Sequence, residues 1–88
     1  MIKKDVHFLL RSSISRKILE CLNRYDKEIS PKQIAKEIDV ARDNVSTRIL
    51  WLAERDLVKC INPEDRLWRF YKITKKGKKV LREIAELI

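Results

Sequence analysis

The chain has 88 residues, 21 of them Lys or Arg and 13 Asp or Glu, so its formal net charge is +8, while 44% of it is hydrophobic. That apolar content excludes a disordered chain, and the length fits one domain over residues 1–88 with little room for a large active-site cleft. No apolar run approaches the roughly 18 residues of a membrane span, and no signal peptide is evident, so we expect a cytoplasmic protein without membrane contact. The basic balance suggests a polyanionic partner.

The first third of the chain predicts one or two helices. Residues 1–11 fit either a helix or an extended N-terminal arm. Ser12 or Ser13 then offers an N-cap for an amphipathic helix, because apolar residues over 14–25 recur at helical spacing. Ile29 is a single apolar residue with room for one short strand pairing.

The best-marked helix start follows at Ser30. This serine can cap the helix, Pro31 suits its first position, and Gln33 can complete a capping box. A short turn at Asp39 leads into the next helix, which we expect over about 41–55.

The last third predicts a hairpin and a helix. Residues 57–61 and 67–73 have strand-like composition and are joined by a polar turn containing proline. Thr74 can cap a last helix over 74–88. The fold class is therefore α+β and mainly helical.

Three stretches in this order resemble the winged helix-turn-helix domain. Residues 30–38 are similar to the family's S-x-x-[ED/Q]-I-A helix, residues 39–58 place apolar positions at the family's spacing, and residues 70–77 are very like its Y-Y-x-L-T-x-x-G ending. The likeness covers about residues 12–81. The overall pattern is similar to small archaeal transcription regulators of the ArsR and MarR kind. It implies a three-helix core, a two-stranded wing and a C-terminal helix at 74–88.

The resemblance implies a sequence-specific double-stranded DNA-binding transcription regulator that reads the major groove with the helix at about 41–55. The candidate DNA contacts are Lys32, Arg42, Asp43, Asn44, Ser46, Thr47, Arg48, Arg66 and Arg69. Arg42 can pair with guanine, Asn44 with adenine, and Asp43 can accept from cytosine. Ser46 and Thr47 are short enough for phosphate contacts. The alternative is that these residues form an ordinary solvated helix face.

The remaining candidates lie at the edges of that helix. Lys32 sits at a helix start, where phosphate binding is favoured. Arg48 lies at the helix flank and suits a phosphate better than a base. Arg66 can reach a phosphate or a minor groove from the wing, with Arg69 set further back, although the wing tip at 63–65 is acidic.

Several positions depart from the family pattern. Asp39 and Asp56 stand where glycine often ends a helix; Asp tolerates the left-handed conformation better than most residues. Ala41 replaces the usual Ser or Thr cap, and Leu50 and Trp51 replace basic residues. Residues 31–60 are also the least basic third, with six basic and five acidic residues. A second hypothesis therefore stays open, namely a winged-helix module for protein association without specific DNA recognition.

Five lysines gather between residues 72 and 79. A strand advances about 3.3 Å per residue, so the wing hairpin carries this cluster roughly 30 Å from the wing tip. A solvated face is therefore the favoured interpretation over a DNA-binding patch.

The aromatic residues and the chain ends concern packing. Trp51, Trp68 and Phe70 fill the core by default, whereas an exposed Trp would mark an association surface. Apolar stripes at 2–10 and 80–88 exceed what one small core readily covers, which predicts a homodimer through the terminal segments.

Residues typical of catalytic sites are scarce. His7 is the only histidine in the sequence. A Gly-rich phosphate loop is excluded, because Gly77 is the only glycine. Cys21 and Cys60 form no CxxC motif and are expected to be reduced thiols. We therefore expect no enzyme activity, no metal, no cofactor and no small-molecule ligand.

Overall fold

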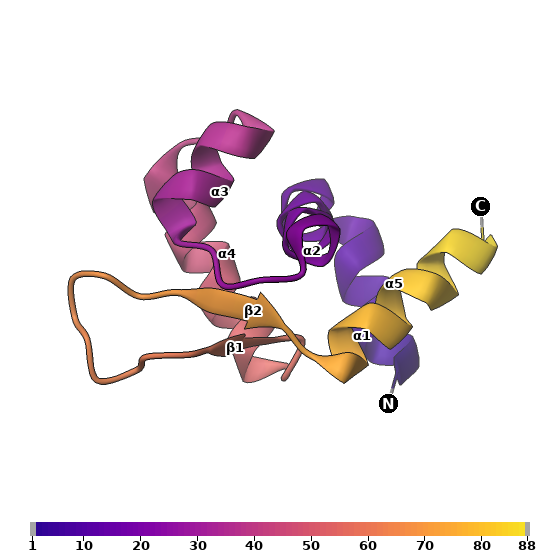
Figure 1. The fold of residues 1–88 in the computed structure, drawn as a ribbon. Coiled ribbons are helices and arrows are strands. Elements are labelled where there is room, and N and C mark those ends of the chain that lie inside the picture. The colour runs from indigo at the N-terminus through magenta and orange to yellow at the C-terminus, as the bar shows by residue number, and fades with distance from the viewer. Residues whose placement is uncertain (1, 88) are drawn as a thin grey trace.

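A computed structural model, which describes residues 2–87, confirms the winged helix-turn-helix fold (Figure 1). Its elements are α1 (Ile2–Arg11), α2 (Ser13–Tyr25), α3 (Pro31–Ile38), α4 (Arg42–Glu54), β1 (Val58–Cys60), β2 (Tyr71–Ile73) and α5 (Lys75–Leu87). α3 and α4 stand at one end of the molecule, α1 and α5 at the other, and α2 lies between them. The β1–β2 hairpin runs along one side, and its long loop projects past α4.

Side-chain caps begin three of the helices at the predicted positions. Ser12, Ser30 and Thr74 each accept the backbone N–H three residues further along, over 3.3, 3.2 and 3.0 Å. These bonds satisfy amides that a helix start leaves without an intrahelical partner. Ala41 precedes α4 and provides no such bond.

Both aspartates in the family's glycine positions adopt the left-handed conformation, as predicted. Asp39 has φ 57° and ends α3, and Asp56 has φ 63° after α4. They allow the chain to reverse direction sharply on either side of α4, which places that helix against both α3 and the hairpin.

Residues 2–11 form a helix, which settles the choice between helix and extended arm. α1 packs against α5, and Val6, Leu9, Val80 and Ile84 are all buried in the shared core. The apolar stripes of α1 and α5 thus pack against each other within the chain, so less apolar surface is left exposed at the terminal segments than predicted. Leu87 stays exposed at the end of α5.

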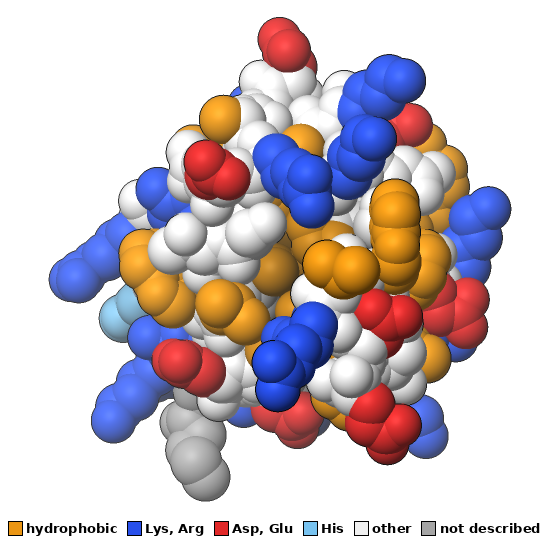
Figure 2. Space-filling view, turned by 90° about the vertical axis from the view of Figure 1, so that its left-hand side faces the viewer, with side chains coloured by type: hydrophobic (Ala, Val, Ile, Leu, Met, Phe, Trp, Pro, Cys, Tyr) orange, Lys and Arg blue, Asp and Glu red, His pale blue; other side chains and the backbone are white. Residues whose placement is uncertain are grey.

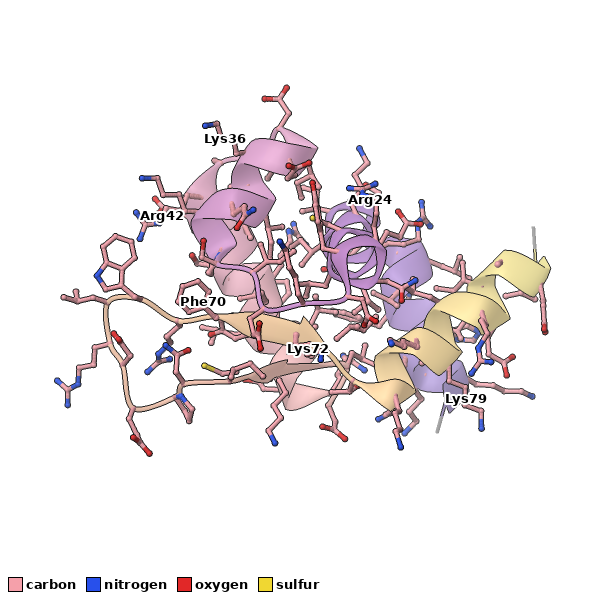
Figure 3. The ribbon with its side chains drawn as sticks, in the orientation of Figure 1. Arg24, Lys36, Arg42, Phe70, Lys72 and Lys79 are labelled. Atoms are coloured by element: carbon pink, nitrogen blue, oxygen red, sulfur yellow. The ribbon has the colours of Figure 1, made fainter. Side chains whose placement is uncertain are left out.

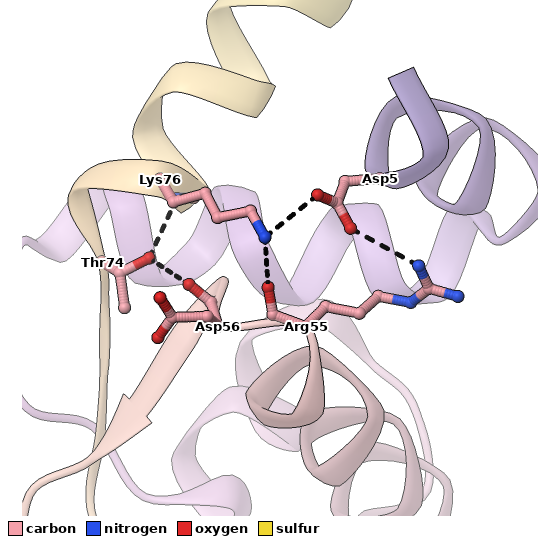
Figure 4. Close-up of polar contacts among 6 residues, drawn as sticks. Asp5, Arg55, Asp56, Thr74 and Lys76 are labelled. Carbon is pink, nitrogen blue, oxygen red and sulfur yellow. Dashed lines mark hydrogen bonds and ion pairs between the residues drawn. The ribbon is translucent and has the colours of Figure 1, made fainter. Parts of the chain in front are cut away.

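Lys75 and Lys79 of the lysine cluster are exposed, as expected of a solvated face, while Lys76 and Lys78 also form ion pairs. Lys76 Nζ lies 3.2 Å from Asp5 Oδ2 and donates to the carbonyl of Arg55 over 2.9 Å (Figure 4). The Arg55 guanidinium lies 3.4 Å from the other Asp5 oxygen. Lys78 pairs with Asp26 over 3.0 Å and lowers the pKa of that carboxyl, chiefly through this hydrogen bond. Two of the lysines therefore join helices together.

The hairpin strands are shorter than predicted. β1 and β2 pair antiparallel over three residues each, and Ile29 adds the expected single bridge to Tyr71. Leu57, the first residue of the predicted strand, lies ahead of β1 and is buried. Residues 61–70, which we call the wing loop, contain no strand; the Ile61 N–H bonds the Phe70 carbonyl, and the Asp65 N–H bonds the Asn62 carbonyl in a turn.

Candidate nucleic-acid interface

A hollow of about 450 Å³ lies between the start of α3, the first two turns of α4 and the wing loop. It is lined by Ser30, Pro31, Lys32, Arg42, Ser46, Ile49, Leu50, Arg66, Leu67, Trp68, Arg69 and Tyr71. We call it the basic hollow. Figure 2 looks onto this side of the molecule and shows hydrophobic atoms in a recess, with Lys and Arg side chains above and below it.

The basic hollow brings together five of the nine predicted contacts. Lys32 comes from α3, Arg42 and Ser46 from α4, and Arg66 and Arg69 from the wing loop. Arg42 projects from the same end of the molecule as the wing loop, whereas Lys79 lies near the opposite end (Figure 3). Lys79, from the lysine cluster, therefore lies away from the candidate site.

Arg48 is held within the protein. Its Nε donates to Asn44 Oδ1 over 2.6 Å, its NH1 donates to the Ser12 hydroxyl over 2.8 Å, and its guanidinium lies 5.5 Å from the centre of the Trp51 ring. Arg48 thereby braces α4 against the start of α2 and orients the Asn44 amide. The i,i+4 spacing of Asn44 and Arg48 is visible in the sequence; the bond to Ser12 is not.

Two other predicted contacts also have internal partners. Thr47 donates its hydroxyl to the Asp43 carbonyl over 3.1 Å, a common arrangement for threonine in a helix. Arg69 Nε donates to the Asp65 carbonyl over 3.0 Å, so this arginine helps to shape the wing loop. Arg42 and Arg66 are exposed at the surface.

Asp65, in the acidic part of the wing loop at residues 63–65, binds backbone amides of the same loop. Asp65 Oδ1 accepts the N–H groups of Trp68 and Leu67 over 2.8 and 2.9 Å. These two bonds, that of Trp68 first, lower the pKa of the Asp65 carboxyl. The ionised carboxylate thus holds the backbone of the wing loop at residues 67 and 68.

Four exposed apolar side chains lie in this region; Leu50 and Trp51 were singled out from the sequence for the alternative of protein association, whereas Leu67 and Trp68 were not predicted as site residues. Leu67 is 80% exposed and Trp68 is 62% exposed on the wing loop, and Leu50 is 49% exposed on α4. Trp51 is 42% exposed and lies on Arg48. The expectation that the tryptophans fill the core is therefore wrong; both lie at the surface.

Two further features can be stated for the described part of the chain. None of its helices is long and apolar enough to cross a membrane. Over residues 2–87, no three His, Cys, Asp or Glu side chains gather as they would to hold a metal ion.

Residues 11–59, more than half of the chain, match the family of winged helix-turn-helix DNA-binding domains. The chain belongs to this family. The match spans α2, α3, α4 and the first residues of β1. It therefore includes the residues of α3 and α4 that line the basic hollow. The family is one of DNA-binding domains rather than enzymes. No curated protein has a significantly similar sequence.

Several solved structures share the fold. A mutant of S. aureus MepR bound to an oligodeoxyribonucleotide has a TM-score of 0.75 at 16% identity, over 98% of this chain and 67% of that one. A MarR-family transcription regulator has a TM-score of 0.72 at 22% identity, over 83% and 48%. The transcriptional repressor CouR, bound to a 23-mer DNA duplex, has a TM-score of 0.69 at 24% identity, over 81% and 50%. The chain thus spans about half to two thirds of these proteins.

Proposed function

We propose that the chain is a sequence-specific double-stranded DNA-binding transcription regulator that reads the major groove with α4. The observation that carries this proposal is the basic hollow, in which Lys32, Arg42 and Arg66 converge from three separate segments. A hollow framed by cations suits one phosphate strand of a duplex. With a strand in that position, the start of α4 would face the major groove on one side of it and the wing loop the adjoining minor groove on the other.

The side chains of α4 divide between base and phosphate contacts in this proposal. Arg42 and Asp43 are exposed on its first turn and reach base edges. Asn44 is oriented by Arg48, so its amide nitrogen can donate to a base acceptor such as adenine N7. Thr47 and Ser46 lie one turn further along and contact the backbone, which fixes the register of the helix on the duplex.

Phosphate contacts by Lys32 and Arg66 supply affinity without sequence preference. Each such contact contributes about 0.9 to the slope of log affinity against log salt on duplex DNA. Lys32→Ala should therefore weaken binding to all sequences and reduce that slope by about 0.9. Lys36→Ala is the matched control, because Lys36 is exposed on the same helix but does not line the basic hollow.

The central experiment selects bound sequences from a random DNA pool with the wild-type chain. The selected site is then titrated in mobility-shift assays against wild type and the triple variant Arg42→Ala, Asn44→Ala, Thr47→Ala. Two lost base contacts at about 1–3 kcal/mol each should reduce specific affinity by roughly 30-fold or more while nonspecific binding persists. Unchanged binding by the triple variant would show that α4 does not read the sequence.

We further propose a homodimer through the terminal helices. Leu10 and Leu87 are exposed apolar residues of α1 and α5, the two helices at the end of the molecule opposite α3 and α4 (Figure 1). Dimers of helix-turn-helix proteins bind half-sites roughly 34 Å apart, so the selected sequences should contain two inverted half-sites at that spacing. Sedimentation that gives a monomer at micromolar concentration, with and without DNA, would contradict this arrangement.

The second candidate function is protein association through α4. It is favoured by the exposure of Leu50 and Trp51 at positions where basic residues are common in the family. DNA binding that occurs only below about 50 mM salt and without sequence preference would support this alternative, because simple basicity gives only such binding.

A further inference from the structure

The wing loop presents two apolar side chains directly to solvent. Leu67 is the most exposed large hydrophobic residue in the described part of the chain, and its neighbour Trp68 is also mainly exposed. We call this pair the apolar tip. Exposing large apolar side chains forgoes hydrophobic stabilisation, so their position at a projecting loop calls for a partner surface.

The exposure is built into the loop by hydrogen bonds. Asp65 accepts the backbone N–H groups of both tip residues, and Asn62 accepts the Phe70 N–H over 2.8 Å while its amide nitrogen donates to the Trp68 carbonyl. Four bonds from two side chains thus hold the backbone in one shape. The bonds direct the tip outward instead of letting it fold onto the core.

The surroundings of the apolar tip favour a polyanion. Arg66 immediately precedes it, and Lys32 and Arg42 face it across the basic hollow. A partner for this surface must therefore both neutralise these cations and offer an apolar slot to Leu67 and Trp68. A duplex offers both features, because its phosphates meet the cations and its stacked base pairs offer flat apolar faces once they are parted.

Resting on the DNA-binding function proposed above, we propose that the apolar tip inserts into the minor groove and parts two stacked base pairs, so that the protein kinks its DNA. Leu67 enters the step, and Trp68 packs beside it against the exposed base and sugar. Side chains of this kind bend duplexes by about 20–90° toward the major groove. Such a bend wraps the duplex around the basic hollow and toward the start of α4.

The kink adds sequence preference at a position that α4 does not touch. Pyrimidine–purine steps such as TA and CA part most readily, so they should be enriched where the wing meets the selected site. A G·C-rich step at the same position should be selected against. This preference would come from the energy of deformation rather than from hydrogen bonds to bases.

The test measures DNA bending with the full chain and the selected duplex labelled at both ends for energy transfer. Wild type should shorten the end-to-end distance, and Leu67→Ala should bind with a straighter duplex. Ile61→Ala is the matched control, because Ile61 is an exposed apolar residue of the same loop that does not line the basic hollow. A single unpaired base at the wing step, which makes kinking easy, should restore bending by the Leu67→Ala variant.

Trp68 gives a second readout in a Trp51→Phe background. Its fluorescence should be quenched on binding the selected duplex, because stacking on a base quenches indole. Specific binding with a straight duplex, or bending unchanged in Leu67→Ala, would overturn the apolar tip alone and leave the DNA-binding proposal standing. Absence of specific binding by wild type would overturn both. A fluorescence change that follows protein concentration without DNA would overturn the tip in favour of a contact between copies of the chain.

Discussion

Gly77 lies where α5 comes closest to the start of the hairpin. A Cβ added there would lie 2.3 Å from the Leu57 carbonyl oxygen and 2.8 Å from Ile73 Cγ1. The same Leu57 oxygen accepts the Thr74 N–H over 3.1 Å. An alanine at position 77 therefore requires the first turn of α5 to move away by about 1 Å, which strains this hydrogen bond.

The cost of Gly77→Ala can be worked out from these contacts. Alanine gains about 1 kcal/mol over glycine in a helix interior. Overpacking against rigid backbone loses about 1–3 kcal/mol, and weakening the hydrogen bond to Leu57 loses about 1 kcal/mol more. We expect a net loss of about 2 kcal/mol in the free energy of unfolding. For a domain of this size, that loss lowers the melting temperature by roughly 8–16 °C.

The assay is urea unfolding followed by circular dichroism, with thermal melts in parallel. Lys79→Gly and Lys79→Ala serve as the control pair, because Lys79 is exposed on the same helix two residues later. In this pair alanine should be the more stable by about 1 kcal/mol, which measures helix propensity alone. A Gly77→Ala variant as stable as wild type would refute the close approach of α5 to Leu57.

Three further predictions concern aspartates. Asp5→Ala should lower the free energy of unfolding, measured in urea, by about 1–3 kcal/mol. The Asp5 side chain is only 7% exposed, whereas its basic partners Arg55 and Lys76 are 38% and 37% exposed, so the ion pairs are only partly screened by water. A change below about 0.5 kcal/mol would show that these pairs do not stabilise the fold. Asp39→Gly should raise stability by about 0.5 kcal/mol, because glycine relieves left-handed strain and loses part of that gain through its freer unfolded chain; a lower melting temperature would contradict this. The depressed pKa of Asp65 means that its stabilisation of the wing loop is present above the ordinary aspartate value of 3.8 and is lost as pH falls through the lower folded value. Amide resonances of Leu67 and Trp68 should therefore shift together, with a midpoint below 3.8, in a pH titration by NMR, and a midpoint at the ordinary value would contradict the two hydrogen bonds.

Features decided by neighbours in the chain were predictable from the sequence. The caps at Ser12, Ser30 and Thr74 and the left-handed turns at Asp39 and Asp56 depend on interactions within a few residues, so residue type and spacing sufficed. Strand length was not predictable in the same way. The composition of 67–73 suits a strand, but side-chain bonds from Asp65 and Asn62 take the N–H groups of Leu67, Trp68 and Phe70, so that only the Phe70 carbonyl pairs across the hairpin before β2 begins.

The roles of individual basic residues depended on tertiary structure. From the sequence, both arginines are candidates for DNA contact, Arg42 with a base and Arg48 with a phosphate. In the folded chain, Arg48 is bound to a serine 36 positions away, whereas Arg42 is exposed at the rim of the basic hollow. A hydrogen bond over such a separation leaves no periodic signal in the sequence.

The charge of the chain shows the same division. The sequence by itself determined the net charge of +8, the family and which helix belongs to the candidate site. It also shows that residues 31–60, which include this helix, are nearly neutral, so the excess charge lies elsewhere in the sequence. Tertiary structure decided where the useful charge lies, because the turn at Asp56 brings the wing loop with Arg66 beside Lys32 and Arg42. The positive charge at the basic hollow comes from three segments that are far apart in the sequence. Packing of the folded chain brings them together, so counting charges along the sequence cannot reveal this site.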